Sequence, residues 1–160
     1  NLIISFFKQE GFLKESDFIN YYKELYKDKK GKAAFKRFLE SKKISSYSID
    51  IAMLDYNENQ ETALRYATLY LKNKVGSNRQ LKLKVFAHLK NKGFSDKTIN
   101  EVMDTLSFDN EENSLNIEIS KYIKRYKNEY NKIISKLANK GYNVNDIKKI
   151  LKKEGMSNEN

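Results

Sequence analysis

The side chains that most often carry out catalysis are scarce in this sequence. His88 is the only histidine and there is no cysteine, so neither a conventional catalytic triad nor a multi-histidine or thiolate metal site can be assembled. The six glycines lie too far apart for the common phosphate-binding loops, GxGxxG and GxxxxGK followed by Ser or Thr. We therefore expect that the protein is not an enzyme and that it binds no cofactor.

Two polar segments resemble metal sites only in part. Residues 55–66 begin like a calcium loop, with acidic and amide side chains at alternate positions. Gln60 stands where that loop needs glycine, however, and Tyr66 stands where it needs a bidentate glutamate. The acidic residues of 109–112 are more typical of a solvated linker than of a magnesium site. We expect no metal at either place.

Positive charge is spread along the chain. The 160 residues include 31 Lys or Arg and 21 Asp or Glu, a formal net charge of +10 at pH 7. The balance is 0 for residues 1–10, +3 for 11–57, +4 for 58–106 and +3 for 107–160. Such a surface favours a polyanionic partner, because each neutralised phosphate releases counterions. The alternative is that the lysines reflect compositional bias and solubility.

Basic residues alternate with aromatic residues in three stretches of the sequence. This pattern suits phosphate contacts combined with some stacking of bases. The competing interpretation places the aromatic rings in the core and the lysines on a solvated face. The candidate residues for nucleic-acid or filament binding are Lys32, Lys36, Arg37, Arg79, Lys82, Lys90, Lys92, Lys124 and Arg125.

One motif occurs three times, and it indicates which elements would position these residues. Its copies are LESKKISSYSIDIAM at 39–53, LKNKGFSDKTINEVM at 89–103 and LANKGYNVNDIKKIL at 137–151. The spacings are 50 and 48 residues, which indicates an internal repeat.

Each copy is interpreted as one helix ending and the next beginning. Gly93 and Gly141 stand where a helix can end in a left-handed residue, followed by an apolar residue that folds back onto the preceding leucine. Ser45, Ser95 and Asn143 then supply N-cap oxygens for the following helix. In the first copy Lys43 replaces the glycine, and since a left-handed residue with a Cβ costs about 1 kcal/mol, we expect a looser turn there.

The apolar spacing predicts a third helix before each pair, and no strand pattern is found. We therefore predict an all-α protein of tandem three-helix repeats, stacked into an elongated, curved array that is right-handed or arch-like. The predicted divisions are the last helix of a preceding repeat at 1–10, three repeats at 11–57, 58–106 and 107–155, and a flexible tail at 156–160.

No window approaches the roughly 18 apolar residues of a membrane span, so we expect a soluble protein with no membrane partner. The absence of cysteine fits a reducing compartment, and we expect the cytoplasm. The first residue is Asn1 rather than methionine, which suggests that the chain lies inside a longer parent protein.

Three segments carry a resemblance to a known family. They are GFLKESDF at 11–18, GKAAFKRFLESKKIS at 31–45 and KVFAHLKNKGFSDKTINEVM at 84–103. In order and spacing they resemble RecX, the bacterial regulatory protein that modulates the RecA recombinase. The departures are Lys43 in place of glycine and the truncated first unit, which would make the chain a carboxy-terminal portion. The matching positions are Gly11, Phe12, Leu13, Phe18, Leu39, Lys42, Ile44, Leu89, Lys92, Gly93, Phe94, Ser95 and Ile99.

The resemblance implies a non-catalytic regulator of homologous recombination, DNA repair and the SOS response. It would bind the RecA filament on single-stranded DNA as a monomer and limit its recombination and ATPase activity. Binding to single-stranded DNA itself would be weak or would depend on the filament. The alternative function is a sequence-tolerant nucleic-acid-binding repeat protein that acts without a recombinase.

Overall fold

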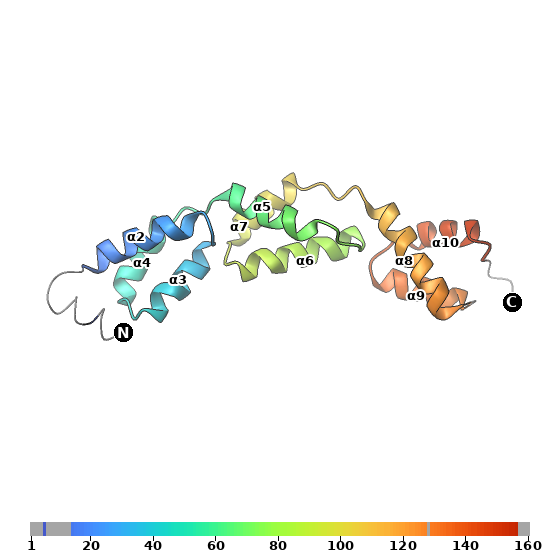
Figure 1. Ribbon diagram of the computed structural model, residues 1–160, viewed down its shortest axis with the longest axis horizontal. Helices are drawn as coiled ribbons and strands as arrows, with labels where there is room; N and C mark the ends of the chain where they lie inside the picture. Colours follow the sequence, from blue (N-terminus) through green and yellow to red (C-terminus); the bar gives the residue numbers. More distant parts are fainter. Residues whose placement is uncertain (1–4, 6–13, 128, 157–160) are drawn as a thin grey trace. The chain divides into compact units, whose positions relative to one another are not determined.

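The structure is a computed structural model that describes residues 5, 14–127 and 129–156. Within these residues the regular elements are all α-helices, and no strand occurs, so the predicted all-α class is confirmed. The helices are α2 (Glu15–Lys27), α3 (Lys32–Ser41), α4 (Ser46–Leu54), α5 (Gln60–Leu71), α6 (Asn78–Asn91), α7 (Asp96–Thr105), α8 (Glu111–Tyr126), α9 (Tyr130–Asn139) and α10 (Val144–Lys153) (Figure 1).

Some of the predictions fall on residues that the structure does not describe. The helix predicted at 1–10 lies outside the described residues except for Ser5, and so do Gly11, Phe12 and Leu13 of the family resemblance. Of the tail predicted at 156–160, only Met156 is described. Among the described helices none is long and apolar enough to cross a membrane.

The chain divides into two compact units. Unit 1 comprises residues 1–69 and 87–105, and unit 2 comprises residues 70–86 and 106–160. Two of the boundaries between these units fall inside α5 and α6, and the third falls at the end of α7. The division into repeats at 11–57, 58–106 and 107–155, and the stacking of these repeats into a curved array, stay predictions.

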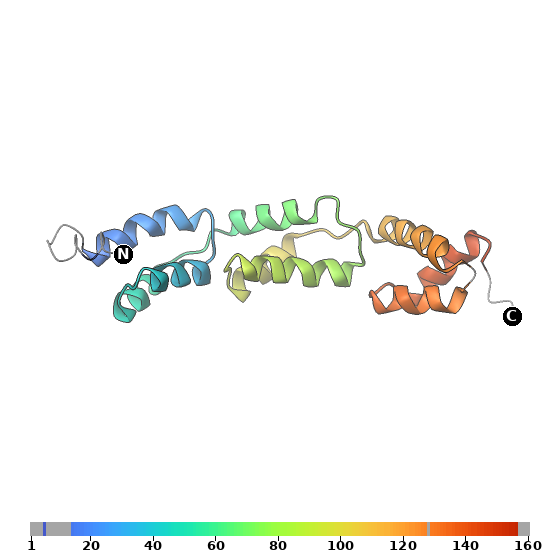
Figure 2. The same ribbon diagram turned by 60° about the horizontal axis from the view of Figure 1, so that its bottom comes forward.

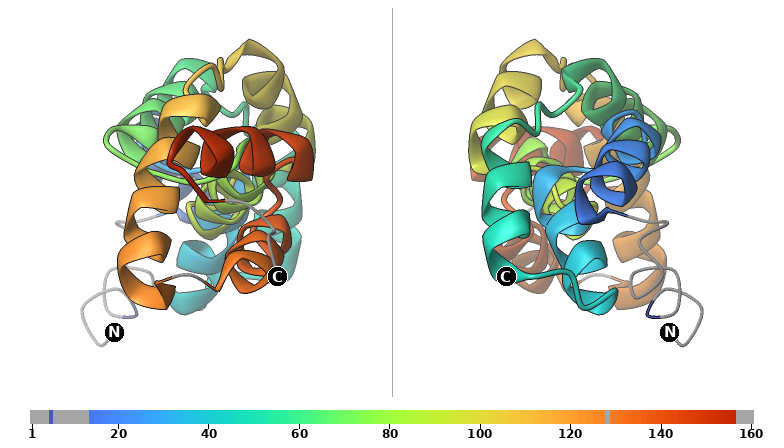
Figure 3. Two further views of the ribbon diagram at one scale, coloured as in Figure 1. Left: turned by 90° about the vertical axis from the view of Figure 1, so that its right-hand side faces the viewer. Right: turned by 90° about the vertical axis from the view of Figure 1, so that its left-hand side faces the viewer.

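Each unit contains a triplet of helices that contact one another pairwise. In unit 1 these are α2, α3 and α4 (Figure 3, right), and in unit 2 they are α8, α9 and α10 (Figure 3, left). Within each triplet the chain reverses direction between successive helices (Figure 2). Short connections make this possible, because they leave the apolar faces of neighbouring helices opposite each other.

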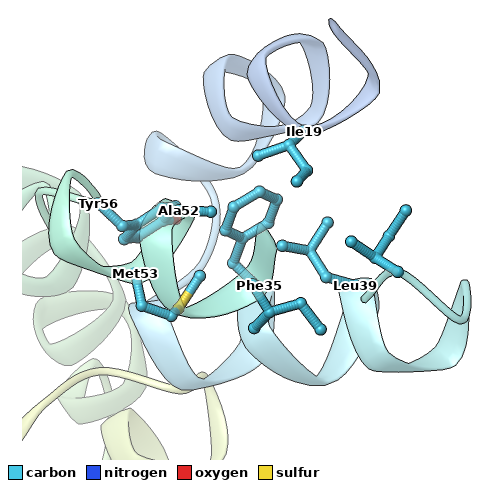
Figure 4. Packing of buried hydrophobic residues seen from close by; sticks show 8 residues of the cluster. Ile19, Phe35, Leu39, Ala52, Met53 and Tyr56 are labelled. Atoms are coloured by element: carbon cyan, nitrogen blue, oxygen red, sulfur yellow. The ribbon is translucent and has the colours of Figure 1, made fainter. Parts of the chain in front are cut away.

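The core of the first triplet is built around α3. Phe35 and Leu39 are four residues apart, so they lie on one face of the helix, and both are fully buried. Ile19 from α2 and Ala52 and Met53 from α4 pack around them (Figure 4). Truncating Phe35 to alanine would cost about 3–5 kcal/mol, the usual range for a buried aromatic residue.

The core of the α8, α9 and α10 triplet follows the same plan with mostly aliphatic residues. Each helix contributes two buried side chains at a spacing of four residues, which is the spacing of one helix face. These residues are Leu115 and Ile119 from α8, Ile133 and Leu137 from α9, and Ile147 and Leu151 from α10.

The three turns predicted from the repeated motif are confirmed, and we call each of them a corner: the place where one helix ends and the next begins. At each one the apolar residue after the left-handed position donates its N–H to the carbonyl of the leucine five residues earlier, which closes the end of the helix. The N···O distances are 3.2 Å for Ile44 to Leu39, 3.2 Å for Phe94 to Leu89 and 3.3 Å for Tyr142 to Leu137. The predicted N-caps also form: Ser45, Ser95 and Asn143 accept from the backbone N–H of Ser48, Thr98 and Asn145.

The expectation of a looser first corner was wrong. Lys43 adopts a φ of 57°, in the same left-handed region as Gly93 and Gly141 at 91°. Its N–H donates to the carbonyl of Glu40 at 2.9 Å, as the glycine N–H groups do in the other corners. Lys43 is exposed, so its side chain meets no obstacle, and the corner keeps its hydrogen bonds at the cost of a strained residue.

Candidate nucleic-acid interface

Three of the predicted cations come together in unit 1. Lys32 and Lys36 lie four residues apart on α3, and with Lys90 of α6 they line one groove. We call this the basic groove; its remaining lining residues are Ala33, Met53, Glu58, Gly93, Phe94 and Ser95. Three cations and one carboxylate, that of Glu58, line the groove, so cations outnumber anions among its lining residues and could contact phosphates.

The groove exists because the start of α3 touches the corner between α6 and α7. The N–H of Gly31 donates to the carbonyl of Lys92 at 3.1 Å, and the N–H of Ala33 donates to the carbonyl of Gly93 at 3.0 Å. A Cβ on Gly31 would lie 2.2 Å from the carbonyl carbon of Gly93, and one on Gly93 would lie 2.4 Å from the nitrogen of Ala34. Only glycine at both positions permits this approach, which we call the Gly31 contact.

The segment that precedes α3 is also held by two tyrosine hydroxyls. The hydroxyl of Tyr56 donates to the carbonyl of Lys30 at 2.8 Å, and that of Tyr66, on α5, donates to the carbonyl of Lys29 at 3.0 Å. Burial raises the pKa of Tyr56 above its ordinary value, so the hydroxyl stays protonated and able to donate. These bonds hold the residues just before α3, which begins at Lys32.

Glu58 joins the two sides of the Gly31 contact. Its carboxylate accepts from the backbone N–H of Lys32 at 2.7 Å, from the N–H of Ser95 at 3.0 Å, and from the hydroxyls of Ser95 and Thr98, each at 2.5 Å. It therefore satisfies donors at the starts of two helices, α3 and α7. Burial alone would raise the pKa of Glu58, but the hydrogen bonds from Ser95, Thr98 and Lys32 lower it below its ordinary value.

A related contact occurs in unit 2, where the start of α6 meets the corner between α9 and α10. The hydroxyl of Ser77 donates to the carbonyl of Lys140 at 2.5 Å, and the N–H of Asn78 donates to Glu111 at 2.9 Å. A Cβ on Gly141 would lie 3.1 Å from Cβ and Cδ of Arg79, so the stem of Arg79 packs beside this corner. We call this the Ser77 contact.

The sequence did not predict that the carboxylates of Glu58 and Glu111 would bond to the starts of other helices. Residues 109–112 were expected to form a solvated linker, but Glu111 begins α8 and binds the start of α6, so that expectation was wrong for Glu111. Glu15 has a matching position in the first triplet, where it accepts from the hydroxyls of Ser45 and Ser48 at 2.8 Å and 2.7 Å. The sequence does show one shared feature: a glutamate stands at or just before the first helix of each predicted repeat, as Glu15 does for α2, Glu58 for α5 and Glu111 for α8.

The other predicted cations lie elsewhere and in different surroundings. Lys92 belongs to unit 1 and places its Nζ 4.7 Å from the ring centroid of Tyr66, and exposed Arg37 projects from α3. In unit 2, Lys82 lies 5.3 Å from the ring of Phe108 and Arg125 lies 5.4 Å from that of Tyr126. Arg79 and Lys124 are exposed in the same unit. Three of these cations, Lys92, Lys82 and Arg125, thus lie over aromatic rings.

Lys90 differs from the other groove cations because it has an acidic partner. Its Nζ lies 2.9 Å from a carboxylate oxygen of Asp96, and both side chains are largely exposed. An exposed pair of this kind contributes at most about 1 kcal/mol, so a phosphate can replace Asp96 at little cost. Lys36 is exposed on the other wall of the groove.

The single histidine of the sequence, His88, is not among the residues that line the basic groove. His88 is half-buried, and its pKa is lowered by burial and by the charge of Lys92, so its imidazole is neutral at pH 7. No group of three or more His, Cys, Asp or Glu in the described part of the chain is placed to hold a metal ion.

The chain has relatives among known proteins. The chain is 26% identical to the "Regulatory protein RecX" of Staphylococcus epidermidis, over 98% of the chain and 64% of that protein. It is also 26% identical to the protein of the same name from Staphylococcus saprophyticus, over 96% of the chain and 62% of that protein. The resemblance to the RecX family is confirmed.

The RecX relatives are longer than this chain, which spans less than two thirds of their length. Their name describes a regulatory protein. No family model matches the chain. No solved structure matches it either.

Proposed function

We propose that this chain is part of a RecX-type regulator that binds the RecA filament on single-stranded DNA and limits its recombination and ATPase activity. The observation that carries the proposal is the similarity to proteins named Regulatory protein RecX over nearly the whole chain. The helical architecture and the lack of a catalytic constellation among the described residues are compatible with a regulator that acts by binding.

In this proposal the basic groove supplies contacts to the phosphates of the filament DNA. Lys32, Lys36 and Lys90 line it, and Arg37 extends the positive surface along α3. The residues of unit 2, Arg79, Lys82, Lys124 and Arg125, and Lys92 in unit 1 add further cations of the same kind. Binding through such residues weakens steeply with salt, because counterions are released on association.

The experiment adds the chain to RecA, ATP and single-stranded DNA and measures ATP hydrolysis and strand exchange. The proposal predicts that both rates fall as the chain is titrated to one copy per binding site on the filament. Unchanged rates at stoichiometric protein would contradict it.

The second candidate function is nucleic-acid binding without a recombinase, and the spread of exposed cations over both units favours it. Insertion of α7 into a duplex groove is disfavoured, because Asp96, Glu101 and Asp104 are exposed on that helix and would repel phosphates. Binding of labelled single-stranded DNA in the absence of RecA separates the two functions. Tight binding that is unaffected by adding RecA would favour the second.

A further inference from the structure

The outer face of α4 is apolar. Tyr47, Ile51 and Leu54 are 76%, 46% and 82% exposed, and their spacing of four and three residues places them in one stripe along the helix. The opposite face of the same helix is also apolar, since Ile49 and Met53 are buried in the core of the first triplet. A helix that is apolar on two faces is usually covered on both.

The repeated motif provides an internal comparison for this stripe. When the leucines of the three corners are aligned, α7 carries Lys97, Glu101 and Asp104 at the positions of Tyr47, Ile51 and Leu54, and α10 carries Asn145, Lys149 and Lys152. All six of these residues are exposed. The same backbone therefore accepts charged and polar residues at these positions. Folding of the corner does not require an apolar stripe, so the stripe on α4 needs another explanation.

The stripe borders a groove between α2 and α4. Ile51, Ala52 and Ile19 contribute apolar walls, and Lys23 lines the α2 side. Three apolar side chains in line, beside a groove with apolar walls, differ from the singly scattered apolar residues of ordinary surfaces. Their geometry matches that of surfaces that receive one face of an amphipathic helix.

The charges on α4 indicate the kind of helix that would fit. Asp50 lies on one side of the stripe and Asp55, the C-cap residue, lies on the other, at 100° per residue. α4 contains no lysine or arginine, whereas α7 contains Lys97 and α10 contains four lysines. In a chain with a net charge of +10, this stripe is thus bordered by carboxylates on its own helix. Basic residues on a partner would complement them.

We propose that the outer face of α4, formed by Tyr47, Ile51 and Leu54 and the adjoining groove, binds an amphipathic helix of a protein partner whose apolar residues are flanked by Lys or Arg. A second copy of the chain fits less well, because Asp50 and Asp55 beside the stripe would face the same carboxylates of the other copy and repel them. The proposal does not depend on RecA as the partner.

The test uses the full chain and a fluorescein-labelled helical peptide of leucine and lysine with Leu at positions i, i+4 and i+7, followed by fluorescence anisotropy. The variant Tyr47→Lys/Ile51→Glu/Leu54→Asp gives α4 the outer residues of α7, which the repeat tolerates. Its helicity, measured by circular dichroism, should equal that of the parent. The matched control is Leu83→Lys, which removes an apolar residue that is 64% exposed on α6.

The parent and Leu83→Lys should bind the peptide alike, and the triple variant should bind at least about tenfold more weakly. A peptide with glutamate in place of lysine should also bind the parent more weakly, although the net charge of the chain would favour it. Equal binding by the parent and the triple variant, or tighter binding of the glutamate peptide, would overturn the proposal. So would a concentration-dependent dimer of the parent that the triple variant lacks, because the occupant would then be a second copy.

Discussion

The Gly31 contact and the Ser77 contact place the start of a helix against the same kind of corner, but they are built from different groups. In unit 1 the main chain of Gly31 and Ala33 bonds directly to the main chain of Lys92 and Gly93. In unit 2 the side chain of Ser77 makes the corresponding bond to the carbonyl of Lys140. One hydroxyl therefore acts as a spacer in the second contact, and the first has none.

The carboxylates of the two contacts differ in the same direction. Glu58 accepts hydrogen bonds from Lys32, Ser95 and Thr98, whereas the bond found for Glu111 comes from Asn78. The same corner can therefore contact the start of another helix through direct backbone bonds or through a side chain, while its own hydrogen bonds stay the same. The contact with the direct backbone bonds is the one that lies beside the basic groove.

The largest difference is expected from alanine at the two corner glycines. Both have a φ of 91°, so both substitutions introduce backbone strain of about 1–2 kcal/mol. At Gly93 the new Cβ would also meet the backbone nitrogen of Ala34 at 2.4 Å, whereas at Gly141 the nearest atoms, on the side chains of Arg79 and Ser77, lie 3.1 Å away. Urea unfolding should show a loss of about 3 kcal/mol or more for Gly93→Ala and roughly half that for Gly141→Ala. Equal losses would mean that the contacts do not differ.

A smaller difference is expected between Glu58→Gln and Glu111→Gln. The amide retains one acceptor oxygen but turns an NH₂ group toward donors that need acceptors, and Glu58 serves more of these donors. We expect Glu58→Gln to lower the free energy of unfolding by about 1–3 kcal/mol and Glu111→Gln by about 1 kcal/mol or less. Chemical denaturation at pH 7 measures both, and a greater loss for Glu111→Gln would contradict the comparison.

The pH dependence of stability should reveal the same carboxylate. The pKa of Glu58 is lower in the folded chain than its ordinary value of 4.5, so the folded state binds this proton more weakly than the unfolded state. Its contribution is then fully present above pH 4.5 and is lost as the pH falls through the folded pKa. Urea midpoints measured across this window should fall more steeply for the parent than for Glu58→Gln. Parallel curves would show that the pKa of Glu58 does not change on folding.

The smallest effect, and one of opposite sign, is expected at the first corner. Lys43 has a φ of 57° and is exposed, so glycine would relieve its strain without removing a packed side chain. Lys43→Gly should stabilise the chain by about 0.5–1 kcal/mol, less the entropy that glycine adds to the unfolded state. Thermal unfolding measures this change, and a clear loss of stability would show that the Lys43 side chain contributes contacts.

The corners could be predicted from the sequence because their interactions are local. Leu89, Gly93, Phe94 and Ser95 lie within seven positions, and their hydrogen bonds join residues no more than five apart. The left-handed position and the N-cap oxygen are therefore visible as residue types at fixed offsets. The helices could be predicted for the same reason, because the spacing of their apolar residues marks the buried face.

The Gly31 contact and the Ser77 contact could not be predicted in this way. Glu58 reaches Ser95 across 37 residues, and Glu111 reaches Asn78 across 33. In the sequence both glutamates stand in polar segments that look like solvated connections. The pairing of Lys90 with Asp96 was missed as well, because it crosses a corner whose geometry the sequence alone does not define. Charged residues are informative only once the distances between helices are known.

The most direct test of the proposed role of the basic groove compares two charge-matched variants in the RecA ATPase assay on single-stranded DNA. Lys36→Gln/Lys90→Gln removes two cations from the groove, and Lys148→Gln/Lys152→Gln removes two exposed cations from α10. Inhibition should be lost by the groove variant, with the slope of log affinity against log salt reduced by roughly 2. The α10 variant should inhibit like the parent. Equal inhibition by both variants, or an equal loss in both, would contradict the role of the groove.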